Sequence, residues 1–391
     1  MNEPDIQREG PAATQRRARF TACFLTFAFN GALALSIGAL LPFVRQTYGL
    51  SYAFAGLLVS LHSIGNLISS FAGGALALRL GRRRSILIFI SCYAAGFLVM
   101  ILSGRPVVLV AAFLLTGLAR GATSNFNNAE VNLLASGAGW ALNALHASFA
   151  VGAFTAPLLV LLCAQVLGRW QLMGVLLAVF GMISFIVYAM MPLPDSLTQA
   201  KGADGGWGFL REGVFWTTTL TLFFYLCAEQ GMIGWMVTYF QDSGLMPAAY
   251  AQTMASVLWI LILVGRLTAA WLCARVSPST LLIGMSGGMA AFFAVTILGR
   301  TLPVITIGIA GFGFFMAGLY PTRVSMTSGL MKRYPLAWSV ILTAASLGSI
   351  LMPSVIGAVA EAAGLYAGIS TVLIAVAATL VMTVVSRLAE S

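Results

Sequence analysis

Twelve long runs of apolar residues dominate the chain, and each is long enough to cross a lipid bilayer as a helix. A transmembrane helix needs about 20 apolar residues, because the hydrocarbon core of a bilayer is about 30 Å thick. The runs cover residues 20–43, 52–78, 85–103, 106–129, 139–165, 170–191, 213–241, 249–274, 278–299, 301–322, 335–360 and 366–387. We therefore expect an all-α integral membrane protein with twelve transmembrane helices and no separate soluble domain.

The composition excludes several other classes of protein. Of the 391 residues, 60% are hydrophobic and only 8% are charged, whereas an average soluble domain is about 25% charged. An ordinary soluble enzyme, a disordered chain and a nucleic-acid-binding domain are all incompatible with these values. The net charge of +10 is not gathered into one patch, as a nucleic-acid partner would require. The five cysteines lie singly inside apolar runs, so they form no disulfide or zinc framework.

The basic residues are divided unevenly between the two ends of the predicted helices. With the N-terminus inside, fifteen basic residues fall on inner segments and four on outer segments. Cytoplasmic loops carry such an excess of Lys and Arg. We therefore expect both termini in the cytoplasm and the protein in the plasma membrane, which in a bacterium is the inner membrane.

A polar segment rich in Gly and Pro, residues 192–212, interrupts the apolar runs near the middle of the chain. Such a composition is typical of a linker. The predicted organisation is a cytoplasmic tail at 1–19, a six-helix half at 20–191, a cytoplasmic linker at 192–212 and a second six-helix half at 213–391.

The two predicted halves share landmarks at a common offset of 196 residues. The matched positions are Gly152-x4-Pro157 with Gly348-x4-Pro353, Arg79 with Arg275, and Gly117 with Gly313. Parallel repeats of this kind occur in transporters whose halves rock around a central site. The alternative is that apolar helices resemble one another by composition alone.

A glycine- and arginine-rich segment joins the second and third runs. Residues 73–84 read GGALALRLGRRR. This resembles the signature loop of the major facilitator superfamily, G-x-L-x-D-R-x-G-R-R/K-R/K, except that the Asp is replaced by Leu78. The resemblance implies two six-helix halves, and it implies a conformational role for Gly74, Arg79, Gly81, Arg82 and Arg83.

Two further segments narrow the resemblance. Residues 142–153 (LNALHASFAVGA) and 224–235 (FYLCAEQGMIGW) look like the fucose-permease-like branch of that superfamily, the fucose/glucose/galactose:proton symporter type. Two acids of fucose permease are absent here, where Gly38 and Ala122 stand. The positions that do match the branch are Asn143, His146, Glu229 and Arg266.

Ionisable residues inside the apolar runs are candidates for function. A charge at the bilayer centre costs about 2.5–3.5 kcal/mol on insertion scales. Glu229 lies at mid-depth of the seventh run, where it is either a proton-coupling or substrate-binding group or part of a structural pair with the eighth. Arg266 is a structural or gating residue or a ligand, and Arg120 either pairs structurally or binds a substrate anion. Glu130, at the inner end of the fourth run, is expected to be solvated.

Neutral polar groups and aromatic rings complete the inventory. His62 and His146 could donate to a solute hydroxyl or carry a proton, or could simply be packing residues. Trp235 and Trp259 could stack on a sugar ring or pack between helices. The candidate substrate-binding or coupling residues are Asn30, His62, Asn66, Arg120, Asn127, Asn143, His146, Glu229, Gln230, Trp235 and Arg266.

Other sequence features bear on the class of function. The chain has no G-x4-G-K-S/T phosphate loop, no His/Cys metal spacing and no nucleophile elbow. We therefore expect neither an ATP-driven pump nor an enzyme, with no cofactor and no metal. A membrane sensor would need an output domain, and a membrane enzyme would need acids or histidines clustered at one interface.

The leading hypothesis is a secondary active transporter of a small polar solute, most simply a sugar or sugar-like metabolite. The driving force is either the proton gradient or the gradient of the solute itself. The alternative within the same fold is an exporter of a polar metabolite or drug. The expected partners are the solute, protons and the lipid bilayer, without nucleic acid, and the expected state is a monomer.

Overall fold

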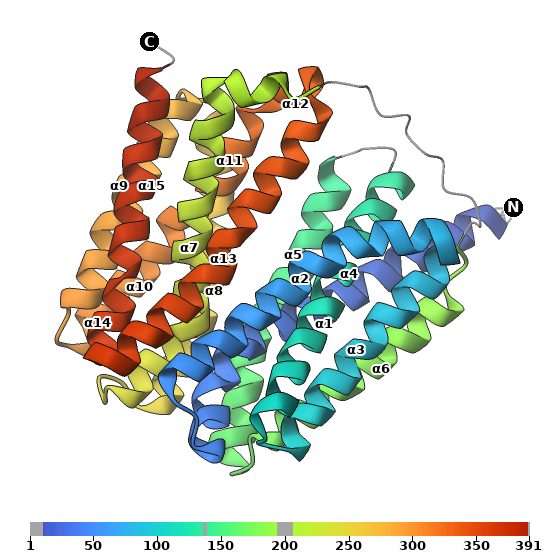
Figure 1. Cartoon of the computed structure of the whole chain (residues 1–391). Coiled ribbons are helices and arrows are strands. Elements are labelled where there is room, and N and C mark those ends of the chain that lie inside the picture. Colours follow the sequence, from blue (N-terminus) through green and yellow to red (C-terminus); the bar gives the residue numbers. More distant parts are fainter. Residues whose placement is uncertain (1–10, 136–138, 194–205, 390–391) are drawn as a thin grey trace, which may run out of the picture.

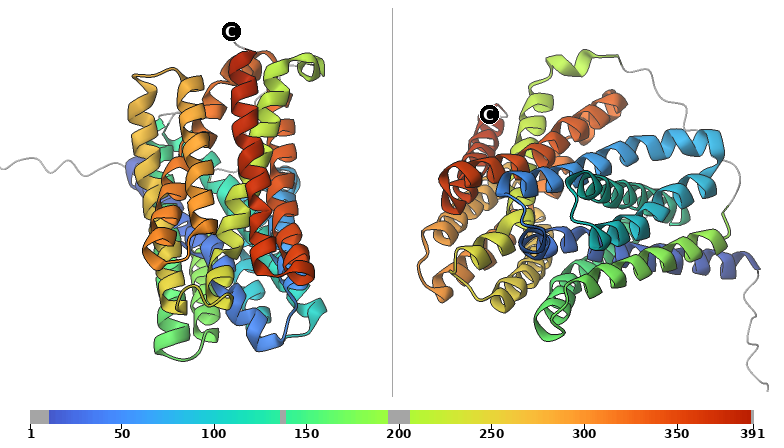
Figure 2. Two further views of the ribbon diagram at one scale, coloured as in Figure 1. Left: turned by 90° about the vertical axis from the view of Figure 1, so that its left-hand side faces the viewer. Right: turned by 60° about the horizontal axis from the view of Figure 1, so that its bottom comes forward.

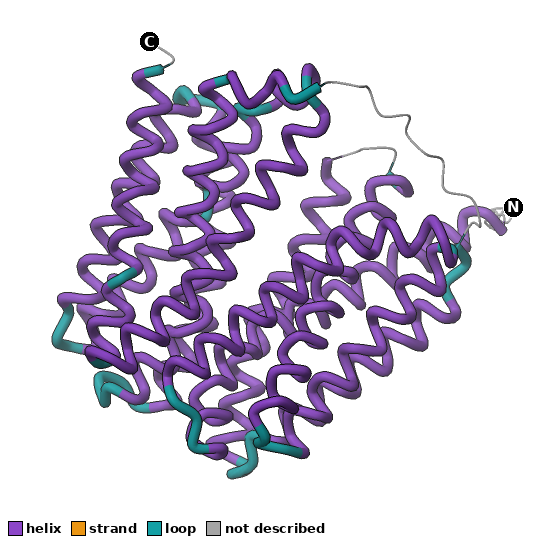
Figure 3. Tube along the Cα trace, in the orientation of Figure 1, coloured by secondary structure: helices purple, strands orange, loops and turns teal. Residues whose placement is uncertain are grey.

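The computed structural model describes residues 11–135, 139–193 and 206–389. Within these ranges the chain is helical, with no strand, and twelve helices are long and apolar enough to cross a membrane. Figure 3 shows short loops between them. The first half contains α1 (Pro11–Tyr48), α2 (Tyr52–Leu80), α3 (Arg82–Leu102), α4 (Pro106–Leu134), α5 (Gly139–Leu161) and α6 (Gln171–Met190). The second half contains α7 (Gly213–Asp242), α8 (Ala248–Cys273), α9 (Pro278–Leu298), α10 (Leu302–Met316), α11 (Leu319–Ser325), α12 (Ser328–Arg333), α13 (Pro335–Ala363), α14 (Leu365–Ser370) and α15 (Val372–Leu388).

Two of the predicted runs are each built from two α-helices, and the fifth run continues from α5 into a short π-helix at Leu162–Val166. The tenth run is α10 followed by α11, with Gly318 between them, and the twelfth is α14 followed by α15. The other predicted boundaries agree with the observed helices within a few residues, except at the beginning of α1.

Helix α1 begins at Pro11, ahead of the predicted start at residue 20. The predicted tail of residues 1–19 is therefore partly helical, and its first ten residues lie outside the described chain. The extension is held to α4, because Arg16 Nε donates to the Leu134 carbonyl at 3.2 Å and Arg19 pairs with Glu130. These polar contacts lengthen the helix beyond its apolar part, which is why hydropathy alone placed the start too late.

The two halves form separate bundles that meet along α1, α2 and α5 of the first half and α7, α8 and α13 of the second (Figures 1 and 2). We call the face that carries the start of α1 and the end of α15 the terminal face, and the other one the opposite face. Helices α2 and α13 lie side by side near the opposite face and separate toward the terminal face (Figure 1).

Hydrogen bonds and an ion pair join the halves at the opposite face. Arg45, near the end of α1, pairs with Asp242, the last residue of α7. Gln46 Nε2 donates to Asp242 Oδ1 at 3.0 Å, and the Tyr52 backbone N–H donates to Glu361 Oε2 at 2.7 Å. We call these five residues the opposite-face latch.

The 196-residue offset recurs in the packing. Gly117 of α4 lies against the carbonyl of His62 in α2, and Gly313 of α10 lies against Leu258 in α8. Both members of the first contact are 196 residues from their counterparts in the second. Because a Cβ at either glycine would overlap these neighbours, small residues are what allow the helices to approach so closely. At this contact, the pairing of α2 with α4 in the first half corresponds to the pairing of α8 with α10 in the second.

Candidate functional site

Glu229 is held on α7 by a neighbour one helical turn away. Tyr225 OH donates to Glu229 Oε1 at 2.9 Å, because side chains four residues apart share a face of a helix. Tyr225 is buried and Glu229 is half-buried. The carboxylate is therefore oriented by a phenol while part of it stays accessible.

A basic side chain of the other half lies within electrostatic range of this carboxylate. The charge of Glu229 acts on Arg120 of α4, although the two form no direct ion pair in the described part of the chain. Arg120 Nη1 lies 3.4 Å from His62 Nε2, and His62 Nδ1 lies 3.0 Å from Thr116 Oγ1. This chain of contacts fixes the guanidinium from the first half.

Helices α5 and α8 run antiparallel across the boundary between the halves and bring further groups together. Ser256 Oγ donates to the Phe154 carbonyl at 2.8 Å, and the ring centroids of Trp259 and Phe149 lie 5.8 Å apart. Closer to the terminal face, Arg266 of α8 acts electrostatically on His146 of α5.

A polar side chain of α1, that of Asn30, is bonded to α4. The Asn30 side chain donates to Ser124 Oγ of α4 at 2.9 Å, and its Oδ1 is buried without a donor among the described residues. The amide oxygen of Asn30 is therefore an acceptor that no described residue uses.

Two residues proposed from the sequence hold helices together. Asn127 Nδ2 donates to Thr26 Oγ1 at 3.1 Å, and Tyr188 OH donates to Asn127 Oδ1 at 3.0 Å, inside the first half. Trp235 is fully buried, and its Nε1 donates to the Pro353 carbonyl at 3.1 Å.

The remaining candidates are less constrained by contacts. Asn66 and Gln230 are half-buried, and His146 is exposed with its ring 5.4 Å from that of Phe27. The side chain of Asn143 lies outside the described part of the structure.

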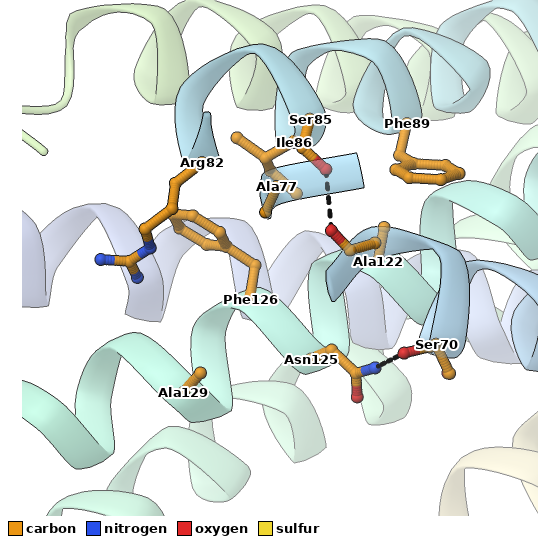
Figure 4. Close-up of a pocket in the computed structure, with 11 residues that line it drawn as sticks. Ser70, Ala77, Arg82, Ser85, Ile86, Phe89, Ala122, Asn125, Phe126 and Ala129 are labelled. Carbon is orange, nitrogen blue, oxygen red and sulfur yellow. Dashed lines mark hydrogen bonds between the residues drawn. The ribbon is translucent and has the colours of Figure 1, made fainter. Parts of the chain in front are cut away.

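The arginine-rich loop lies at the terminal face. Gly81, with φ of +84°, ends α2 and begins α3, a conformation that favours glycine. Arg83 Nη2 donates to the Met191 carbonyl at 2.6 Å, whereas Arg79 is exposed and Gly74 lies within α2. Arg82 lies beside Phe126 at the rim of a pocket between α2, α3 and α4 (Figure 4).

The expectation that Glu130 is solvated is wrong. Its side chain is fully buried, between Arg19 of α1 and Arg82 of α3. Two arginines desolvate the carboxylate and compensate its charge. The sequence gives no sign of this pairing, because Arg19 and Arg82 are both distant from Glu130 along the chain.

Two paired six-helix bundles, with charged groups near their boundary, are an architecture of membrane transporters. The Major Facilitator Superfamily model matches residues 22–353, and the chain belongs to this family. That prediction from the loop motif is confirmed.

Curated relatives share parts of the sequence. The chain is 25% identical over 114 residues to major facilitator superfamily domain-containing protein 4A of Homo sapiens, covering 29% of the chain and 22% of that protein. It is 33% identical over 112 residues to the gallate transporter of Pseudomonas putida, covering 29% of the chain and 25% of that protein. The match to sodium-dependent glucose transporter 1 of Xenopus laevis is 22% identical and covers 79% of the chain and 68% of that protein.

Solved structures share the fold over nearly the whole chain. The nucleoside transporter NupG superposes with a TM-score of 0.75 at 16% identity, covering 95% of this chain and 98% of that one. A variant of the E. coli fucose:proton symporter FucP gives a TM-score of 0.62 at 19% identity, covering 94% and 98%. These likenesses show the fold.

Proposed function

We propose that this protein is a secondary transporter of a small hydroxylated solute, a sugar or sugar-like metabolite, that works by alternating access. One observation carries the proposal: charged and polar side chains of both halves gather between them. The first half contributes His62, Arg120 and His146, and the second contributes Glu229 and Arg266. We call these five residues the central cluster. A solute bound there touches both halves, so their rearrangement exposes it to one side or the other.

The excess of basic residues on the terminal face supports a cytoplasmic location for that face. The opposite-face latch is closed, and α2 and α13 separate toward the terminal face. With this orientation the structure represents the inward-facing state.

The names of similar proteins support a hydroxylated solute. The relative and the neighbours described above are named for glucose, fucose and nucleosides. All three solutes carry several hydroxyl groups, which neutral donors and acceptors such as Asn30, Asn66 and Gln230 suit.

Counterflow in proteoliposomes tests the proposal. Purified protein is reconstituted into vesicles loaded with one unlabelled solute, and entry of the same labelled solute is followed for a panel of sugars, sugar acids and nucleosides. Transient accumulation of at least one member is expected, above that of protein-free vesicles. No exchange of any member would contradict the proposal.

The same vesicles show whether the protein imports or exports the solute. They also show whether transport is driven by the proton gradient or by the gradient of the solute itself. If protons are coupled inward, an acidic exterior increases accumulation from outside. If the protein is an exporter of the antiport type, the acidic exterior instead lowers the retained solute. Arg275→Gln changes an exposed residue beyond α8. It serves as the control variant and should transport as the unmodified protein does.

A further inference from the structure

The central cluster carries more positive than negative charge. It contains two guanidinium groups, Arg120 and Arg266, and one carboxylate, Glu229. Arg stays protonated in proteins, so one positive charge remains when the two histidines are neutral. Among the described residues, neither arginine forms an ion pair with a carboxylate.

Arg266 has hydrogen-bond donors that no described residue uses. In the part of the chain that the structure describes, its guanidinium donates no hydrogen bond, and its Nε is buried without an acceptor. A guanidinium presents five donors in a planar fork that matches a carboxylate. The unpaired fork is therefore suited to an anion that arrives from outside the chain.

A second unpartnered donor lies on the same face of the same helix. Trp259 is only 8% exposed, and its indole Nε1–H has no acceptor among the described residues. Trp259 and Arg266 are seven residues apart, which places them about 10 Å apart on one face of α8. An aromatic surface with an N–H and a cationic fork can together contact a ring and its acidic substituent.

We propose that the solute is a hydroxylated organic monoanion whose carboxylate binds Arg266, with Arg120 completing the charge balance. This inference rests on the transport function proposed above and names the class of its solute. When the halves close around the cluster, water leaves, and the excess positive charge needs a counter-ion. A neutral sugar leaves that charge uncompensated, whereas a monocarboxylate cancels it. A phosphate ester carries about −1.5 to −2 at neutral pH, so it overcompensates.

Matched pairs of solutes test the charge directly. The pairs are glucuronate with glucose and gallate with methyl gallate, which differ chiefly in the carboxylate. The readout is the melting temperature of the purified protein in detergent, because a ligand that binds the folded state raises it. We expect at least one carboxylate to raise the melting temperature and its neutral partner to do so much less.

Variants assign the effect to the arginine. Arg266→Gln should weaken the binding of the carboxylate about 10- to 100-fold, as expected for loss of a charge-assisted hydrogen bond. Arg266→Lys should keep part of the affinity for the carboxylate, and Arg275→Gln should leave that affinity unchanged. Unchanged binding of the carboxylate by Arg266→Gln, or an equal loss in Arg266→Gln and Arg275→Gln, would overturn the assignment.

The outcomes separate this inference from the proposed function. A shift with glucose but not with glucuronate would overturn the monoanion inference and leave the transport of a neutral sugar standing. No shift with any of the four solutes, together with no counterflow, would overturn both.

Discussion

At the scale of single residues, charge burial distinguishes two glutamates. Glu130 is fully buried and paired with two arginines, whereas Glu229 is half-buried and bonded to a phenol. The first arrangement satisfies a charge within one half. The second leaves a carboxylate near the boundary between the halves, where the proposed movement of the halves would change its environment.

Glu130→Gln should destabilise the folded protein by about 3–5 kcal/mol, because it leaves Arg19 and Arg82 largely buried without their carboxylate. Thermal unfolding of the purified protein measures the loss. The control is Glu212→Gln, whose pair with Arg333 is exposed and should be worth about 0–1 kcal/mol. Equal effects of the two substitutions would refute a structural role for the buried triad.

Glu229→Gln should abolish accumulation driven by a pH gradient while preserving exchange at equal concentrations. The amide keeps the shape and can still accept the Tyr225 hydrogen bond, but it cannot bind and release a proton. Counterflow and gradient-driven uptake in the same vesicles separate the two activities. If Glu229→Gln still accumulates solute in response to pH, the glutamate is a structural hydrogen-bonding group and His62 or His146 becomes the better candidate.

At the scale of helices, packing depends on close approach of backbones. Gly152 of α5 lies against the carbonyl of Ala28 in α1, and Gly348 of α13 lies against that of Phe223 in α7. The two glycines are related by the 196-residue offset, and their partners by an offset of 195 residues. Each glycine brings together two helices that also face the other half, so it helps to position the central cluster.

Gly152→Ala should cost about 1–3 kcal/mol of stability through overpacking, since the added methyl group overlaps backbone atoms that cannot rotate away. Gly287→Ala in α9 is the matched control, because a Cβ there meets open space. It should be neutral or stabilising by up to about 1 kcal/mol. Thermal unfolding compares the two, and a Gly152→Ala protein as stable as the control would show that α1 and α5 are not in close contact.

The helices themselves were largely predictable from the sequence, because bilayer thickness sets the length of each apolar run. The repeat could also be found, since Gly117 and Gly313 keep the same offset. The extension of α1 and the burial of Glu130 could not be predicted, because both depend on contacts between α1, α3 and α4 that join residues far apart in the sequence. Within the site, Tyr225 could have been noticed four residues before Glu229, but the pairing of α5 with α8 required the structure.

At the scale of the whole molecule, the opposite-face latch joins the two halves. Arg45 pairs with Asp242 and also stacks on the ring of Tyr52 at 4.2 Å, so one arginine links three helices. If the halves rock, breaking this latch favours the state that opens at the opposite face and closes at the terminal face.

Two pairs of spin labels follow this motion in a background without the five native cysteines. Leu80→Cys with Val276→Cys reports on the terminal face, and Arg105→Cys with Thr301→Cys reports on the opposite face. All four positions are exposed, and each pair is related by the 196-residue offset.

The most direct test of alternating access is the response of both distances to Asp242→Asn in reconstituted vesicles, with Glu212→Gln as the control. Rocking predicts that the terminal-face distance shortens while the opposite-face distance lengthens, and that the control changes neither. Two distances that stay unchanged in Asp242→Asn, or that change in the same direction, would contradict it.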